Sequence, residues 1–252
     1  MMHALRKLEI NGGRVDQGDT YQLVLPEISE GYTDAQLDDY GGLRRKNYLW
    51  RQGTRMELRA RFSHTTGELV GTAGFGFWNA PFGDPNVGWP ALPKAAWYFY
   101  ASNESNLPLT LRGAGRGWFA STLDSTRAEA LVLAPLAPFI ILLNNISRVR
   151  SLLWPFVRNR LEISFQEVPV EIDEWHSYRL CWMDDRCEFW VDGESTHRTT
   201  FSPGGPMGFV CWIDNQYLVA TPSGRFSWGS IPVAKKQWLE ISDLNLVATA
   251  SC

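Results

Sequence analysis

The sequence predicts an all-β protein, a sandwich or jelly roll. Short apolar runs with a two-residue period follow one another, and turn residues separate them. Residues 175–193 carry two such runs around Asp184 and Asp185, and aspartate tolerates turn geometry, so this segment is predicted to be a β-hairpin. At 252 residues, with 44% hydrophobic and 20% charged residues, the chain is large enough and apolar enough to bury a sizeable core.

The composition excludes some classes of partner. A net charge of −3 gives no general attraction to nucleic acid. No metal site and no cofactor is expected, because none of the cysteines has metal-ligand spacing; they are Cys181, Cys187, Cys211 and Cys252. Cys181 and Cys187 are not directly opposite in the predicted hairpin, so a bridge between them is not favoured. The N-terminal residues lack the apolar run of a secretory signal, so we expect a cytoplasmic protein with reduced cysteines.

Alternating residues predict the individual strands. In 56–62 the side chains of Met56, Leu58, Ala60 and Phe62 share one face, and charged residues occupy the other. In the hairpin, His176, Tyr178, Leu180 and Trp182 share a face in the same way. Further strands are predicted at 21–25, 71–78, 95–100, 208–213, 217–220 and 238–246. Residues 31–40 are polar, with an alternation that is compatible with a strand. We expect Asp34, Asp38 and Asp39 to lie in a solvated loop rather than to bind calcium, with pairing to Arg44, Arg45, Arg59 or Arg61 as the alternative.

Residues 126–160 break the strand pattern, and we expect them to form an insertion in one domain, 1–252. The apolar run 130–143 has 14 residues and two prolines, whereas a membrane span needs roughly 20 apolar residues. Residues 146–157 predict a basic amphipathic helix. Three interpretations of the insertion are open. It packs on the sandwich, it covers an apolar pocket as a lid, or it makes peripheral membrane contact through 130–158. The lid candidates are Leu131, Phe139, Leu153, Trp154 and Phe156.

Residues 175–178 are W-H-S-Y, and residues 190–193 are W-V-D-G. These two segments resemble two neighbouring strands of the concanavalin A-like lectin and glucanase superfamily, and most of all of glycoside hydrolase family 16. Residues 56–61, 71–78, 207–215 and 238–244 resemble further strands in the same chain order. The resemblance implies a concanavalin A-like β-sandwich over most of 20–247, interrupted by the insertion.

The resemblance also identifies the strand that carries the catalytic carboxylates in the family, and in this chain those carboxylates are missing. Family 16 enzymes use alternating carboxylates on one strand, one as nucleophile and one as general acid/base, roughly 5 Å apart. Chain order places this strand at 94–99, where Lys94 and Tyr98 occupy the two positions, and no carboxylate lies between Asp84 and Glu104. The resemblance therefore implies a degenerate active site. The run 171–174 (E-I-D-E) matches the motif loosely, but it directly precedes the W-H-S-Y strand and is predicted to be a turn.

Three functions stay open at this stage. The first is a diverged family 16-like protein that binds a glycan or another ligand on its concave face, through Trp78, Trp97, Phe99, Trp212, Asn215 and Gln216. The second is an enzyme or carrier for an apolar small molecule under the lid, with Tyr98, Lys94 or Asp214 as its polar groups. The third is an interaction or membrane-surface module. Whether the protein is an enzyme is left open.

Overall fold

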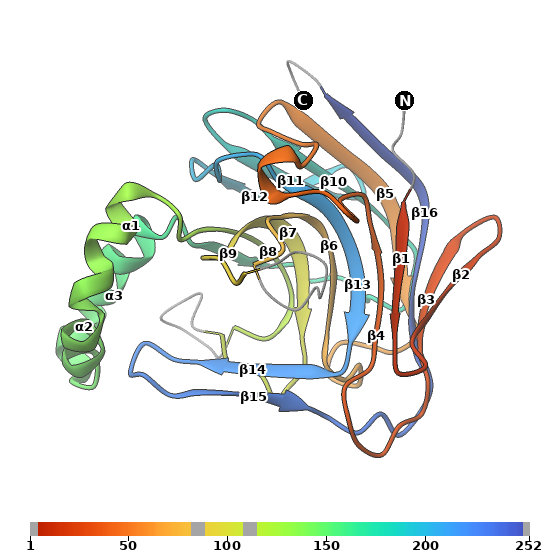
Figure 1. Cartoon of the computed structure of the whole chain (residues 1–252), viewed down its shortest axis with the longest axis horizontal. Coiled ribbons are helices and arrows are strands. Elements are labelled where there is room, and N and C mark those ends of the chain that lie inside the picture. The colour runs from red at the N-terminus through yellow and green to blue at the C-terminus, as the bar shows by residue number, and fades with distance from the viewer. Residues whose placement is uncertain (1–4, 82–88, 108–114, 249–252) are drawn as a thin grey trace.

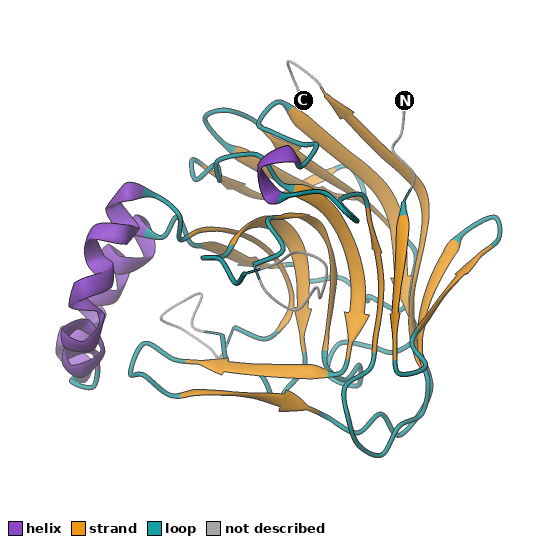
Figure 2. Ribbon diagram, viewed as in Figure 1, coloured by secondary structure: helices purple, strands orange, loops and turns teal. Residues whose placement is uncertain are grey.

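The computed structural model describes residues 5–81, 89–107 and 115–248, and two large sheets stack face to face in it (Figure 1, Figure 2). Sheet A has seven strands in the order β1 (Arg6–Ile10), β4 (Asp34–Asp38), β13 (Gly208–Asp214), β6 (Thr72–Trp78), β7 (Lys94–Ala101), β8 (Gly117–Asp124) and β9 (Ser164–Glu167). Sheet B has seven in the order β12 (Glu194–Thr199), β11 (Cys187–Val191), β10 (His176–Trp182), β5 (Thr54–Phe62), β16 (Gln237–Ala248), β3 (Tyr21–Leu25) and β2 (Arg14–Gln17). The all-β jelly-roll sandwich is confirmed.

The main core lies between the two sheets and is built by the alternation that the sequence shows. On β5 the residues Met56, Leu58, Ala60 and Phe62 are all buried in it. The predicted hairpin forms β10 and β11, with Trp182 opposite Cys187. Its apolar face, Tyr178, Leu180 and Trp182, is buried in the same core, as predicted.

Strand β7 sits near the middle of sheet A and has apolar residues on both faces. Ala96, Tyr98 and Tyr100 point into the core between the sheets. The intervening residues Trp97 and Phe99 point to the other side, where they join a second apolar cluster. Both faces of this strand are therefore largely covered, although only one of them faces sheet B.

The acidic segment 34–39 differs from the sequence prediction. Asp34 and Asp38 lie on β4, and Asp39 directly follows it; all three are buried. Arg6 on the neighbouring strand β1 donates to both carboxylate oxygens of Asp38, at 3.1 and 2.6 Å. The solvated loop predicted for these residues is wrong, because strand pairing supplies partners that the local sequence does not contain.

Other strands were not predicted, among them β8 and β9, which complete one edge of sheet A. Between them lie the helices α1 (Ala128–Leu133), α2 (Ala137–Asn144) and α3 (Ser147–Arg160), with the 3-10 turn η2 (Ala134–Leu136). A short 3-10 turn, η1 (Arg45–Asn47), precedes β5. The strands β14 (Gln216–Ala220) and β15 (Phe226–Ser230) form a separate hairpin. The helices stand at the left end of Figure 1, and the tip of this hairpin reaches toward them.

The cysteines differ in their state. Cys187 and Cys211 are free thiols, both buried, and burial raises the pKa of each thiol. Cys181 is disulfide-bonded, and because Cys187 is free, the bridge does not join the two hairpin cysteines. Cys252 lies outside the described residues. The reduced state expected for all four cysteines is wrong for Cys181, and disulfides are typical of oxidising compartments. The location of the protein stays a prediction.

Candidate functional site

The face of sheet A that points away from sheet B carries a continuous layer of aromatic rings, here called the aromatic face. Figure 1 shows β13, β6 and β7 curving around this side of the sheet. The layer starts with three indoles on adjacent strands, Trp212, Trp78 and Trp97. The rings of Trp78 and Trp212 are nearly parallel, with 6.3 Å between their centroids. Trp97 contacts both, with centroids 6.1 Å from Trp78 and 5.3 Å from Trp212.

The layer extends from the indoles toward the edge of the sheet. Phe99 lies 5.0 Å from Trp97, Phe119 on β8 lies 5.3 Å from Phe99, and Phe165 on β9 lies 4.7 Å from Phe119, all between ring centroids. Trp78, Trp97 and Phe99 remain partly exposed, whereas Trp212 is only 8% exposed. The aromatic face thus combines partly exposed rings with neighbouring rings that are buried by their contacts.

Two glycines on β6 make room for this layer. A Cβ on Gly74 would lie 2.9 Å from a ring carbon of Trp212, and one on Gly76 would lie 2.6 Å from the Cβ of Trp97. Both added atoms would also collide with the backbone of β7, at the carbonyl oxygens of Tyr98 (2.3 Å) and Ala96 (2.5 Å), so side chains here would disturb the strand that carries Trp97. A glycine inside a strand often marks such a close approach.

Polar groups border the indoles on one side. The hydroxyl of Tyr40 accepts a hydrogen bond from Trp78 Nε1 at 2.8 Å and lies 3.1 Å from Gln36 Nε2. Gln36 also donates to Asp38 at 2.9 Å. Tyr48 stacks on Tyr40, with ring centroids 4.9 Å apart. Tyr40 and Gln36 are both buried, so this hydroxyl and this amide hold the indole of Trp78 in place rather than face solvent.

A buried carboxyl borders the indoles on the other side. Asp214 Oδ1 accepts hydrogen bonds from the hydroxyl of Thr72 at 2.9 Å and from the N–H of Gln216 at 2.9 Å. Thr72 in turn accepts one from Trp212 Nε1 at 3.0 Å. Burial raises the pKa of Asp214 to about 7, although these hydrogen bonds oppose the rise. Asp34 is the cross-strand partner of Asp214, so two carboxyls are adjacent here.

The structure places the three proposed catalytic residues apart. Tyr98 lies inside the core, and its hydroxyl donates toward the backbone carbonyls of Trp190 (2.9 Å) and Arg179 (3.1 Å) in sheet B. Lys94 Nζ donates to the carbonyl of Gly204 at 2.5 Å, and burial lowers its pKa. Only Asp214 borders the aromatic face, so Tyr98 and Lys94 cannot act there together with it.

Of the predicted ligand-binding residues, the structure brings four together on the aromatic face: Trp78, Trp97, Phe99 and Trp212. Asn215 is fully buried, and its amide is engaged by the backbone at Thr33, Gly31 and Ile231. Gln216 is exposed at the start of β14. Sequence reasoning missed Gln36, Tyr40 and Thr72, because their place beside the indoles depends on strand register.

The predicted lid residues lie in the helical insertion and differ in their exposure. Trp154 is buried and Leu153 half-buried, but Leu131, Phe139 and Phe156 are exposed on their outer sides. Within the described residues each helix has its main contacts with another part of the helical insertion. The lid interpretation stays a prediction. The turn predicted at 171–174 is confirmed, with Glu174 N–H donating to Glu171 O at 3.0 Å.

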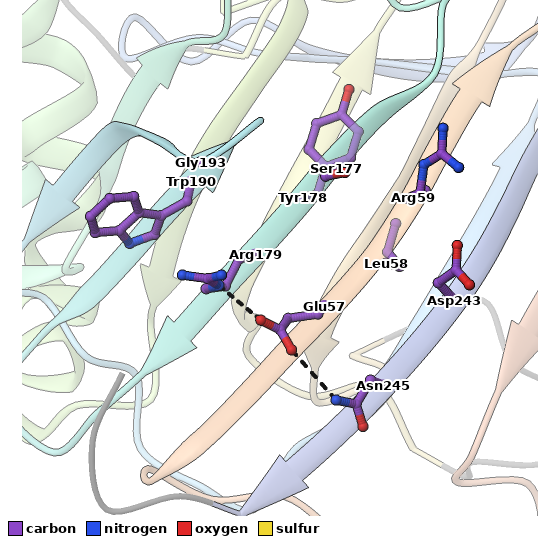
Figure 3. Close-up of a pocket in the computed structure, with 10 residues that line it drawn as sticks. All are labelled: Glu57, Leu58, Arg59, Ser177, Tyr178, Arg179, Trp190, Gly193, Asp243 and Asn245. Atoms are coloured by element: carbon purple, nitrogen blue, oxygen red, sulfur yellow. Dashed lines mark hydrogen bonds and ion pairs between the residues drawn. The ribbon is translucent and has the colours of Figure 1, made fainter.

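A pocket with a volume of about 310 Å³ lies on the outer face of sheet B, away from the aromatic face (Figure 3). Figure 3 shows Glu57 between Arg179 and Asn245, on three neighbouring strands. Glu57 accepts from Arg179 at 2.9 Å and from Asn245 at 3.4 Å. The guanidinium of Arg59 lies 5.2 Å from the ring of Trp175. Glu57 and Arg179 already pair with each other, so a ligand that bound either side chain would compete with this contact.

Comparison with solved structures agrees with this architecture. A chain from work described as "Prominent members of the human gut microbiota express endo-acting O-glycanases to initiate mucin breakdown" is similar, with a TM-score of 0.51, 13% identity, and coverage of 95% of this chain and 84% of that one. An endo-β-1,4-glucuronan lyase from the fungus Trichoderma reesei has a TM-score of 0.49, 10% identity, and coverage of 97% and 90%. The carbohydrate recognition domain of Emp47p has a TM-score of 0.48, 13% identity, and coverage of 98% and 89%.

The fold is a concanavalin A-like β-sandwich, as the resemblance implied. No protein-family model matches the sequence, and no curated protein matches it either.

Proposed function

We propose that the protein binds a glycan on the aromatic face and lacks the two-carboxylate hydrolysis of family 16. The observation that carries the proposal is the position of Trp78, Trp97 and Phe99. They lie outside the sandwich core, touch one another, and stay partly exposed. The apolar C–H surface of a sugar ring packs on aromatic faces, and its hydroxyls bond to neighbouring amides and hydroxyls. The shared fold with an O-glycanase-related chain makes glycans the ligand class to test first.

The absence of family 16 hydrolysis is supported by the residues of β7. This strand, Lys94–Ala101, holds no carboxylate on either face. Carboxyls on the aromatic side lie on β4, on β13 and, at the opposite edge of the sheet, on β9, where Glu167 is the cross-strand partner of Phe119. Asp38 is bound by Arg6, and Asp34 faces Asp214, whose pKa near 7 reflects burial. Asp34 and Asp38 lie four residues apart on β4 and face the same side, as the family's alternating carboxylates do, but both are buried and Asp38 is ion-paired with Arg6 at 2.6 Å.

Replacement of Trp97 by alanine is expected to weaken glycan binding about tenfold, because one stacking surface of about 1.4 kcal/mol is lost. A glycan array identifies the ligand, and titration calorimetry with that ligand measures the dissociation constant. Trp190→Ala is the matched control, since Trp190 is also a half-buried tryptophan but lies on the outer face of sheet B. Equal weakening by both variants, or no effect of Trp97→Ala, would contradict the assignment of the aromatic face.

No release of reducing sugar is expected from the glycan that binds. The assay compares the wild type with Glu171→Gln, Glu174→Gln and Asp214→Asn. Release that survives the two glutamine changes but is lost in Asp214→Asn would mean that Asp214 acts in hydrolysis, and it would overturn the proposal of a degenerate site.

A further inference from the structure

We propose that the helical insertion, together with the tip of the β14–β15 hairpin, attaches the protein to the surface of a membrane that contains anionic lipid. The insertion exposes apolar side chains to an unusual degree. Val132 is 72% exposed, Phe139 69%, Leu142 65% and Leu152 80%. Helix α2 is apolar on nearly every side, and a helix of this kind is normally covered.

The exposed apolar surface is continuous with the neighbouring hairpin. Asn145 Nδ2 donates to the carbonyl of Ser223 at 3.3 Å, and Ile141 lies directly against Gly224. Phe226 and Trp228, on the strand that follows, are 66% and 67% exposed, and their rings contact at 5.3 Å. Apolar patches of this extent on a soluble surface mark interaction sites, and tryptophan is enriched where a protein meets the membrane–water interface.

The positive charge of the helical insertion indicates an anionic partner. Residues 126–160 hold five arginines and one glutamate, although the whole chain has a net charge of −3. Arg127 pairs with Glu162 at 2.8 Å and Arg160 with Glu129 at 2.5 Å, so the excess positive charge comes from Arg148, Arg150 and Arg158. Along α3 the positions Arg148, Leu152, Phe156 and Arg160 are four residues apart, so they form one row on the helix. Arg160 lies 5.0 Å from the ring of Phe156. Apolar side chains flanked by arginine are typical of helices that lie in the interface of anionic membranes.

A second copy of the chain fits this surface less well. Self-association through it would bring two arginine-rich faces together, and like charges in contact oppose association. The mode of attachment is peripheral. In the part of the chain that the structure describes, no helix is long and apolar enough to cross a membrane. Helix α3, with 14 residues, instead has the length and composition to lie in the plane of the interface.

Vesicle flotation tests the proposal. The wild type is expected to float with vesicles of phosphatidylcholine and phosphatidylglycerol, and at least about tenfold less with phosphatidylcholine alone. Arg148→Glu with Arg150→Glu is expected to lower binding to the anionic vesicles by at least about tenfold. Phe139→Ser with Leu142→Ser removes exposed apolar surface and is expected to lower it to a similar degree.

The matched control is Lys235→Glu with Lys236→Glu. It makes the same change in charge at two exposed neighbouring residues in the segment that enters β16. This control is expected to bind vesicles as the wild type does, and all variants are expected to keep glycan binding. Failure of the wild type to float, or equal loss in the control and the Arg148/Arg150 variant, would overturn the proposal. So would a dimer in sedimentation velocity that the two serine changes dissociate and that does not bind vesicles.

Discussion

Replacement of Tyr98 by alanine is expected to lower the free energy of unfolding by about 4 kcal/mol, as large-to-small changes of buried aromatic residues do. Tyr98 is fully buried, and its ring contacts Phe75, Tyr178 and Phe189 with centroids 5.0 to 5.5 Å away. Removal of the ring leaves a cavity where the two sheets meet. Urea unfolding of the purified variant measures the change.

Tyr98→Phe separates the ring from the hydroxyl. This variant keeps the packing but loses the hydrogen bonds to the carbonyls of Arg179 and Trp190, so a cost of about 1 kcal/mol is expected. Glycan binding is expected to be unchanged in it. If Tyr98→Ala had the stability of the wild type, Tyr98 would not be the core residue that links sheet A to sheet B.

The stability of the protein is expected to fall as the pH rises from about 4 to about 7, with a contribution from Asp214 on the order of 4 kcal/mol. Burial raises the pKa of Asp214 from 3.8 to about 7 in the folded protein. Between these values the unfolded chain has released the proton while the folded protein still holds it. Unfolding is therefore favoured as the pH rises, and the loss is complete above about 7.

Asp214→Asn isolates this contribution, because an amide does not ionise. Relative to the wild type, the variant is expected to gain stability between about pH 4 and about pH 8, measured by urea unfolding at both values. Asp39 adds a loss of the same sign, since burial raises its pKa to about 6, but it is present in both proteins and cancels in the difference. If the free energies of unfolding of the wild type and of Asp214→Asn changed with pH in parallel, the prediction would be wrong, because Asp214 would then ionise as readily in the folded protein as in the unfolded chain.

The candidate site was only partly predictable from the sequence. The four aromatic residues of the face were identified, because aromatic residues on strands flanked by glycine stand out. The sequence did not show which residues of β7 face sheet B and which face away from it. Ala96 and Tyr98 on one side are as apolar as Trp97 and Phe99 on the other, so the two-residue period does not distinguish the face toward sheet B from the face away from it. The polar neighbours Gln36, Tyr40 and Thr72 carry no local signal at all.

The sequence by itself determined the all-β class, the hairpin of β10 and β11, and the buried faces of β5 and β10. These follow from alternation, which is a property of each strand alone, since successive side chains point to opposite faces. Only the tertiary structure decided that Tyr98 supports the core, that Asp34 and Asp38 are buried, and that the aromatic rings form one layer. Each of these depends on partners that are distant in the chain, such as Arg6 for Asp38 and Trp190 for Tyr98, and the pairing of strands brings them into contact.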